Sequence, residues 1–313
     1  MQFREIVGQS SACMQLRRAF LHGRLSHAYI FDGPEGVGKR TTALALAALL
    51  LCETPHEGDS CGACASCKQL AAGTHPDCHL IAPDGRGIKI KQIRELRARL
   101  SGTASYGGYT VVIIDAAEIM TLEAANAFLK TVEEPQGPTC FILVTNGAER
   151  LPDTIRSRAQ TVRFAPLSQA NLAHLLGTAA DTPEGHIALD LAQGSISRAQ
   201  ALLADEAQRS TLMARREALE TLLRQLPTQH DGALLRFADG FSGDRDGVLA
   251  EVLLIRRYYE ARLKESAAAG GDLSVPLTVL HDTTVALERL GTNAEPSFIL
   301  GALLITVAQH SRH

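Results

Sequence analysis

Short apolar segments of β type alternate with helical segments along the first half of the chain. Four of them are rich in β-branched or aromatic residues, and they span residues 27–31, 109–114, 139–145 and 161–164. An apolar helical pattern over 41–51 follows the first one. Strands that alternate with helices are typical of βαβ units around a parallel sheet. The pattern therefore predicts an α/β domain with flanking helices, in which ligands bind at the carboxyl ends of the strands.

From Pro166 onward the hydrophobic pattern is helical. Apolar residues recur at helical spacing over 168–176, 183–193, 212–226, 247–264 and 275–290. A loop is expected at 266–271. The chain has 313 residues, whereas single domains usually hold ~100–200. We therefore expect three parts, which are an α/β core over 1–166, a small helical domain over 167–206 and a second helical domain over 207–313.

Composition and charge narrow the range of functions. The chain is 45% hydrophobic, 21% charged and 4% aromatic, which is typical of a globular protein and excludes the disordered and fibrous classes. A formal net charge of -3 provides no general basic field for nucleic acid. The first residues lack the pattern of a secretion signal, and the early apolar run is too short to span a bilayer. We expect a cytoplasmic protein, and any contact that it makes with DNA should be local or made through partners.

A glycine-rich loop follows the first predicted strand. Its sequence is Gly-Pro-Glu-Gly-Val-Gly-Lys, with glycines at Gly33, Gly36 and Gly38 and a lysine at Lys39. Glycines allow backbone N–H groups to turn inward around a phosphate, and the lysine reaches the outer phosphate oxygens. The alternative is a chance glycine turn. Because the loop joins a predicted strand to a predicted helix, the pattern favours a phosphate-binding loop.

The position after the lysine lacks the residue that hydrolysis of a bound nucleotide requires. A Ser or Thr is expected there to ligate Mg²⁺ through its hydroxyl, but this chain has Arg40. Thr41 and Thr42 come one and two residues late. Since a helix turns by ~100° per residue, Thr41 does not present its hydroxyl in the same direction. The loop therefore predicts phosphate binding without hydrolysis.

A second catalytic residue is also missing. Asp115 follows the predicted strand over 109–114, as the metal-binding aspartate of ATPases with a phosphate-binding loop does. The next residue is commonly a glutamate that polarises the attacking water, but here it is Ala116. Glu118 lies further along, on the following helix or turn. Two losses with different chemical roles indicate a site that no longer hydrolyses ATP.

A cluster of cysteines predicts a metal site. Cys52, Cys61, Cys64 and Cys67 are separated by eight, two and two residues. Structural Zn²⁺ takes four soft ligands, and the Cys-x-x-Cys step supplies adjacent ones. We expect one structural zinc and a loop over 53–60 that is ordered only when the metal closes it. An iron–sulfur cluster is the rival assignment, although its usual spacing differs. Three further candidate ligands lie nearby, at His75, Cys78 and His79.

Several motifs occur in an order that resembles one family. They are Gly8-Gln9, the strand over 27–31, the glycine loop, the cysteine cluster, residues 73–77, Asp115, residues 126–135, Asn146, residues 155–158 and residues 194–199. This order resembles the bacterial clamp-loader subunits of the AAA+ family over at least residues 5–200. The segment over 126–135 and the Ser157-Arg158 pair are specific to clamp loaders within that family.

Within this family the chain is most similar to the delta-prime subunits of DNA polymerase III. Motor subunits of the gamma and tau type keep both residues that Arg40 and Ala116 replace here, whereas delta-prime subunits commonly lack them. The resemblance implies a AAA+ P-loop core with a zinc module at about 52–78, a helical lid and a helical collar. It also implies a stator-like subunit that joins delta and gamma or tau subunits and helps to load the sliding clamp on primed DNA during replication.

The resemblance assigns roles to three further residues. Arg158 matches an arginine finger that acts on the ATP site of a neighbouring subunit, although Ala159 replaces the family's cysteine. The guanidinium carries that chemistry, so the lost cysteine matters little. Asn146 matches sensor 1 and Arg198 matches sensor 2, both of which contact nucleotide in their own subunit. The competing interpretations are a solvated loop residue, a strand-end cap and a salt bridge, respectively.

Two other functions remain open. The first is a gamma/tau-type motor that hydrolyses ATP through Thr41 and Glu118. The second is a standalone zinc-containing protein that binds nucleic acid. The net charge and the lack of interleaved basic and aromatic residues argue against the second.

Overall fold

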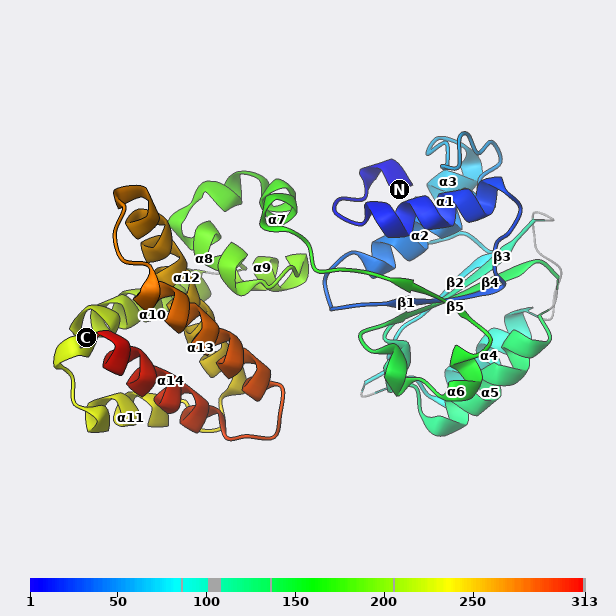
Figure 1. Ribbon diagram of the computed structural model, residues 1–313. Coiled ribbons are helices and arrows are strands. Elements are labelled where there is room, and N and C mark those ends of the chain that lie inside the picture. Colours follow the sequence, from blue (N-terminus) through cyan, green and yellow to red (C-terminus); the bar gives the residue numbers. More distant parts are fainter. Residues whose placement is uncertain (86, 101–107, 136, 205, 312–313) are drawn as a thin grey trace. The chain divides into compact units, whose positions relative to one another are not determined.

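The computed structural model describes residues 1–85, 87–100, 108–135, 137–204 and 206–311 (Figure 1). The chain forms two compact units. The first comprises Met1–Leu175 with Gly194–Ser197, and the second comprises Leu176–Gln193 with Arg198–His313. The expected division into core, lid and collar stays a prediction.

A parallel sheet forms the centre of the first unit. Its strands are β1 (Ala28–Asp32), β2 (Cys78–Ile81), β3 (Thr110–Ile114), β4 (Thr139–Thr145) and β5 (Gln160–Arg163). They lie in the order β2-β3-β4-β1-β5, and every paired neighbour is parallel. The α/β prediction is confirmed, and four strands lie within one residue of their expected bounds. β2 was not predicted, because this short strand at the edge of the sheet is largely half-buried and lacks a continuous apolar pattern.

Helices cover both faces of this sheet (Figure 1). They are α1 (Ser10–Leu21), α2 (Lys39–Leu51), α3 (Ala65–Ala71), α4 (Ile90–Leu100), α5 (Leu122–Glu133) and α6 (Asp153–Arg156). α7 (Gln169–Leu176) follows β5 in the chain and belongs to the first unit up to Leu175. Side chains of a strand alternate between its faces. Phe31 accordingly joins the core beneath α1 and α2, and Ile30 joins the core beneath α4 and α5. Short 3-10 turns lie at Phe3–Glu5 (η1), Ala117–Ile119 (η2) and Ala148–Arg150 (η3).

The register of the strands brings their carboxyl ends together. Asp32 of β1 lies opposite Thr145 of β4, and Ile114 of β3 lies opposite Leu143 of β4. The glycine loop, Asp115 and Asn146 follow these strands directly. The edge of the sheet therefore gathers the residues that the sequence singles out, as expected for a parallel sheet.

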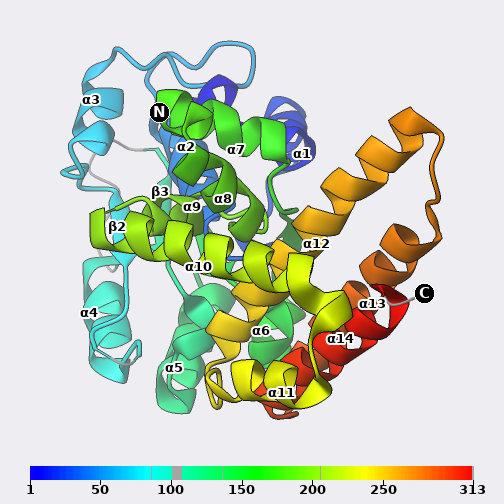
Figure 2. The same cartoon turned by 90° about the vertical axis from the view of Figure 1, so that its left-hand side faces the viewer.

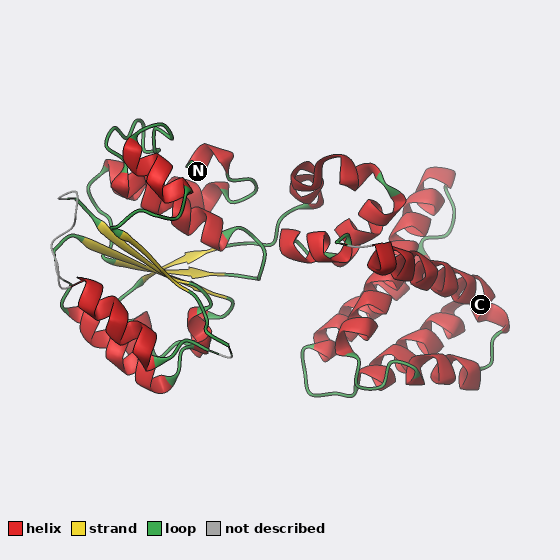
Figure 3. Ribbon diagram, turned by 180° about the vertical axis from the view of Figure 1, so that it is seen from behind, coloured by secondary structure: helices red, strands yellow, loops and turns green. Residues whose placement is uncertain are grey.

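The described residues of the second unit form helices joined by loops, without a strand (Figure 3). Its longer helices are α8 (Pro183–Leu191), α10 (Glu206–Gln225), α11 (Asp231–Asp239), α12 (Arg245–Ala269), α13 (Ser274–Leu290) and α14 (Pro296–Ser311), with η4 (Gly177–Asp181) and η5 (Leu226–Thr228) as short turns. α9 (Ile196–Leu202) begins in the first unit and ends in the second. α12, α13 and α14 contact one another and share one hydrophobic core with α10 and α11 (Figure 2). No helix in the described ranges is both long and apolar enough to cross a membrane.

The loop expected at 266–271 is wrong for its first four residues. α12 continues to Ala269 and ends at Gly270, whose φ of 67° lies in the left-handed region. The Gly271 N–H then donates to the Ser266 carbonyl at 2.8 Å. Alanine is the strongest helix former, so the three alanines extend the helix until a glycine can close it.

Candidate functional site

The glycine loop is held in a conformation that side chains would prevent. A Cβ on Gly33 would lie 2.3 Å from the Phe164 carbonyl oxygen, and one on Gly36 would lie 2.2 Å from Ser195 Oγ. Gly38 meets no such neighbour, but its φ of 98° lies in the left-handed region and it caps α2. Glycine is therefore needed at all three positions, for space at two of them and for backbone conformation at the third. The loop leads into the N-terminus of α2, where backbone N–H groups favour an anion.

Lys39 is buried within this loop. Only 5% of the residue is exposed. Its ammonium donates to the Gly33 carbonyl at 2.5 Å, to the Pro34 carbonyl, and to Asn146 Oδ1 at 2.9 Å. Burial lowers the pKa of Lys39, and nearby carboxylates, Glu118 first among them, oppose that effect. The structure thus brings together Lys39 and Asn146, which the sequence placed in one site.

Arg40 stands directly after the loop lysine, where the sequence lacks the expected Ser or Thr. Its guanidinium Nη1 lies 3.4 Å from Asp115 Oδ2. Thr42 does not replace the absent hydroxyl, because its Oγ1 donates back to the Gly38 carbonyl at 2.9 Å and the residue is fully buried. Thr41 is exposed and lines the adjacent pocket. Arg40 therefore pairs with Asp115, for which the sequence predicted a metal-binding role.

These residues line a pocket of about 710 Å³. Lys39, Arg40, Asp115 and Asn146 contribute to its wall, as does Glu118 from η2. Glu118 Oε2 is buried and has no hydrogen-bond partner among the described residues. Such a volume lies within the ~300–1,000 Å³ of small-molecule sites. The sequence offered Glu118 to this site only under the alternative motor function, and the turn after Ala116 directs it into the pocket.

The sequence also assigned roles to two arginines. Arg158 follows α6, is 41% exposed at its side chain, and pairs with Glu133 Oε1 at 2.9 Å. Its Nη1 also donates to the Thr154 carbonyl at 3.1 Å. It does not contribute to the pocket wall beside Lys39. Arg198 belongs to the second unit, so its assignment to the nucleotide site stays a prediction.

The four cysteines of the predicted metal site converge. The sulfurs of Cys52, Cys61, Cys64 and Cys67 all lie within 4.8 Å of one another. A tetrahedral zinc with Zn–S bonds of ~2.3 Å separates its sulfurs by ~3.8 Å. The distance between the sulfurs of Cys61 and Cys67 is 4.0 Å. The clustering that the spacing predicted is confirmed, and four soft donors at these distances fit a structural metal ion.

Local hydrogen bonds prepare the cluster for a cation. Backbone N–H groups donate to the sulfurs of Cys52 and Cys61 at 3.2 and 3.3 Å. Hydrogen bonds, the largest from Thr54, lower the pKa of Cys61 to about 6, whereas burial first of all raises the pKa of Cys67 to about 12. A cation bound by these sulfurs would favour the thiolate form of both side chains.

The other candidate ligands have different partners. His75 Nε2 lies 2.8 Å from Ser66 Oγ, and His75 Nδ1 accepts from the Asp77 N–H at 3.1 Å. Cys78 and His79 belong to strand β2. Among the described residues, the metal-ligand group at this place therefore consists of the four cysteines that the spacing indicated.

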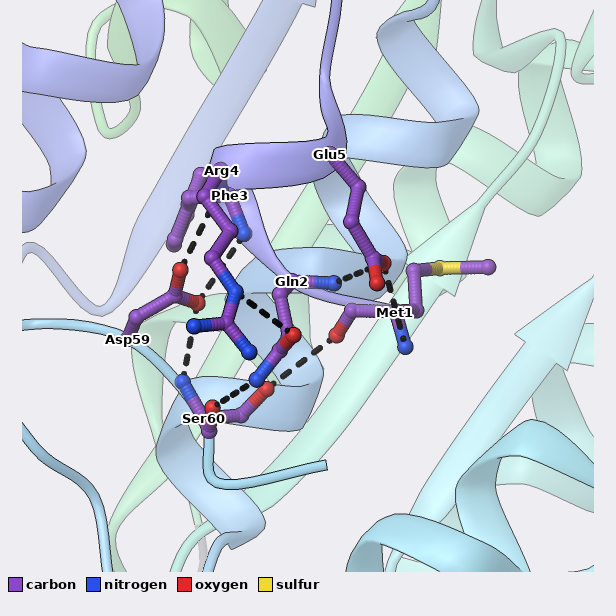
Figure 4. Close-up of polar contacts among 7 residues, drawn as sticks. All are labelled: Met1, Gln2, Phe3, Arg4, Glu5, Asp59 and Ser60. Atoms are coloured by element: carbon purple, nitrogen blue, oxygen red, sulfur yellow. Dashed lines mark hydrogen bonds and ion pairs between the residues drawn. The ribbon is translucent and has the colours of Figure 1, made fainter. Parts of the chain in front are cut away.

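The loop over 53–60 is attached to the N-terminal residues as well as to the cluster (Figure 4). Asp59 accepts from the backbone N–H groups of Phe3 and Arg4 at 2.9 and 3.2 Å. Gln2 Nε2 donates to the Ser60 carbonyl at 2.6 Å. These contacts connect the loop to the core without involving any sulfur, so the expectation that metal alone orders the loop overlooked a second anchor.

Comparison with known proteins identifies the family. A family model described as DNA polymerase III, delta subunit matches residues 8–168, and the chain belongs to this family. The match covers all five strands, the glycine loop and the cysteine cluster. The family expected from the order of motifs is therefore confirmed.

Individual relatives agree with this result. The DNA polymerase III subunit delta' of Pseudomonas aeruginosa is 42% identical over 161 residues, which are 50% of this chain and 49% of that protein. The delta' subunit of Bacillus subtilis is 44% identical over 144 residues, 46% of this chain and 44% of that protein. The tau subunit of Escherichia coli is 32% identical over 240 residues, 76% of this chain and 36% of that protein. The chain thus spans about half the length of the delta' relatives it matches.

Proposed function

We propose that this chain is a non-motor subunit of the DNA polymerase III clamp loader, with a structural role in a ring of related subunits. The observation that carries the proposal is the contact between Arg40 and Asp115 at 3.4 Å. In this contact an arginine is paired with the aspartate, which binds Mg²⁺ in a site that hydrolyses ATP. The similarity to delta' subunits in the first unit supports the same role.

The residue after Asp115 supports the same proposal. Ala116 has no carboxylate to orient water and adopts a left-handed φ of 51°. The partners we propose are delta and gamma or tau subunits, with which the chain acts on the sliding clamp and primed DNA. The second, helical unit is the part we assign to assembly with them.

We assign Arg158 to the ATP site of a neighbouring subunit. Its guanidinium is part-exposed at the surface and is oriented by Glu133 and by the Thr154 carbonyl, outside the pocket of its own chain. An arginine supplied from a neighbour stabilises charge on the transferring phosphate and raises the rate of hydrolysis ~10³–10⁵-fold. Held at the surface in this way, Arg158 is available to another chain.

The test is Arg158→Ala in the assembled clamp loader. We expect the ATPase that depends on clamp and DNA to fall by at least ~10²-fold, with assembly intact in size-exclusion chromatography. Arg158→Lys should also fail, since lysine lacks the planar fork of the guanidinium. Arg156→Ala is the matched control, because Arg156 is similarly exposed and pairs with Asp153 of its own helix. Unchanged ATPase in Arg158→Ala would contradict the assignment.

A motor ATPase is the second candidate, and the position of Glu118 favours it. This carboxylate lines the pocket with one oxygen that lacks a hydrogen-bond partner in the described part of the chain, as a water-orienting group would. Steady-state ATP turnover by the purified chain decides between the two. Turnover that disappears in both Lys39→Ala and Glu118→Gln would establish a motor and refute the non-motor role.

We further propose that Cys52, Cys61, Cys64 and Cys67 hold one structural zinc ion. The four sulfurs supply the soft tetrahedral ligand set that Zn²⁺ prefers, and the ion would close the loop between α2 and α3. Its role is structural, because four protein ligands leave no open position for a substrate.

A further inference from the structure

The pocket beside the glycine loop carries its own cation at the place where a nucleotide site normally carries a metal. Arg40 follows the loop lysine directly, and its guanidinium lies 3.4 Å from Asp115 Oδ2. We propose that this pocket binds the metal-free form of a nucleoside di- or triphosphate, with Arg40 in place of Mg²⁺. The proposal rests on the non-hydrolytic role proposed above and specifies the ligand of that degenerate site.

The pocket lacks the hydroxyl ligand that Mg²⁺ normally uses, and its aspartate is already paired with an arginine. Mg²⁺ demands nearly ideal octahedral coordination by oxygens. The hydroxyl normally found after the lysine is absent, and the Thr42 hydroxyl is fully buried and bonded to its own helix turn. Asp115, the aspartate that would hold the metal, is paired with Arg40. A divalent cation would have to displace a guanidinium and then remain beside it, which charge repulsion opposes.

The pocket retains the groups that bind phosphate. Gly36 and Gly38 keep the backbone conformation of the loop, and the N-terminus of α2 points its free N–H groups into the loop. Lys39 is buried and donates to two loop carbonyls and to Asn146, contacts that phosphate oxygens can replace. An ammonium in a partly desolvated site gains from exchanging neutral acceptors for a charged one.

Arg40 can serve a phosphate and Asp115 together. Its side chain is 54% exposed, so it can move toward an entering ligand, and its guanidinium has five N–H donors. Arginine binds phosphate through two parallel hydrogen bonds and stays charged at any physiological pH. Glu118 and Asp115 add negative charge to the wall, so the phosphates depend on both Lys39 and Arg40 for neutralisation.

This arrangement predicts an inverted response to magnesium. In ordinary phosphate-loop proteins the metal bridges the phosphates to the protein and strengthens binding. Here the aspartate that would hold Mg²⁺ is paired with Arg40, and Mg²⁺ in solution binds the same phosphate oxygens that Arg40 would contact. Excess Mg²⁺ should therefore leave the affinity unchanged or lower it.

The experiment measures ADP and ATP binding to the full chain by isothermal titration calorimetry, in EDTA and in excess Mg²⁺. The wild type should bind at least as tightly in EDTA as in Mg²⁺. Arg40→Thr restores the hydroxyl and removes the cation, so its binding should be at least ~10-fold tighter in Mg²⁺ than in EDTA. Arg40→Lys keeps the charge and should keep the metal independence. Arg156→Ala is the control with an exposed arginine outside the pocket.

Three results would overturn the proposal. They are no binding by the folded wild type in EDTA, tighter wild-type binding in Mg²⁺, and metal independence that persists in Arg40→Thr. Lys39→Ala should abolish binding under both conditions, and binding that survives this change would place the nucleotide elsewhere. Thermal unfolding of each variant checks that it is folded. The Arg158→Ala test does not depend on this pocket, so failure here leaves the arginine-finger assignment to be judged separately.

Discussion

A buried carboxylate in the second unit provides a sharp test of the energetics of this fold. Glu251 lies on α12 and is 1% exposed. Its Oε1 lies 3.3 Å from Arg215 Nε, whereas its Oε2 has no hydrogen-bond partner in the described ranges. The Arg215 guanidinium also lies 5.2 Å from the centroid of the Phe241 ring. Burial therefore opposes the charged form of Glu251, and a single arginine favours it.

Burial has a larger effect on the pKa of Glu251 than Arg215 has, and it sets the sign of the pH dependence of stability. Desolvation raises the pKa of Glu251 from 4.5 to about 7, against the lowering effect of Arg215. Between these two values the unfolded chain releases its proton while the folded chain keeps it, so stability falls as pH rises. At ~1.4 kcal/mol per pKa unit, the full loss above pH 7 is roughly 3 kcal/mol. Below about pH 4.5 both states are protonated and the loss disappears.

Glu251→Gln should remove this loss, because the amide has nearly the same shape and never ionises. We expect the variant to be more stable than the wild type at about pH 8, by up to roughly 3 kcal/mol, and nearly equal to it at about pH 4.5. The control is Glu260→Gln on the same helix, where Glu260 pairs with Arg256 at 3.1 Å on a more exposed surface. This control should change stability by less than ~1 kcal/mol.

Amide hydrogen exchange of α12 in the full chain is the assay. Two compact units make global unfolding unsuitable for a single free energy, whereas the slowest amides of one helix report the stability of its own unit. The comparison of variant and wild type at each pH removes the intrinsic pH dependence of exchange. Lower protection of Glu251→Gln at about pH 8 would refute the reasoning, since it would mean that the Arg215 ion pair outweighs burial.

Two further predictions concern the cysteine cluster and the loop over 53–60. Asp59→Ala removes the acceptor for the Phe3 and Arg4 N–H groups, so the exchange of these amides should accelerate ~10–100-fold, as the loss of ~1.5–3 kcal/mol implies. Unchanged exchange would show that the N-terminal anchor is unimportant. Zinc analysis by mass spectrometry should find one ion per wild-type chain and a strongly reduced content in Cys64→Ser, with Cys78→Ser as the control outside the cluster. Equal loss of zinc in both variants would contradict the four-cysteine ligand set.

Local patterns were sufficient to predict most of the α/β unit and the contents of its site. The strand over 139–145 was predicted residue for residue, because all its residues are buried and its five central ones are apolar. The glycine loop was predicted because its conformation depends on glycines at fixed spacing. The cysteine cluster was predicted because the Cys-x-x-Cys step brings neighbouring ligands together within one turn. In each case the identifying pattern lies among residues close in the chain.

Tertiary contacts decided what those patterns left open. β2 exists because it pairs with β3, and its own residues give only a weak strand signal. The sequence indicated that Arg40 replaces a metal ligand, but only the parallel register of β1, β3 and β4 places Asp115 within reach of its guanidinium. The contact of Asp59 with the backbone N–H groups of Phe3 and Arg4 likewise joins segments that are far apart in the chain. Contacts between distant segments depend on the path of the whole backbone, so the residue pairs that define this site were visible only in the folded chain.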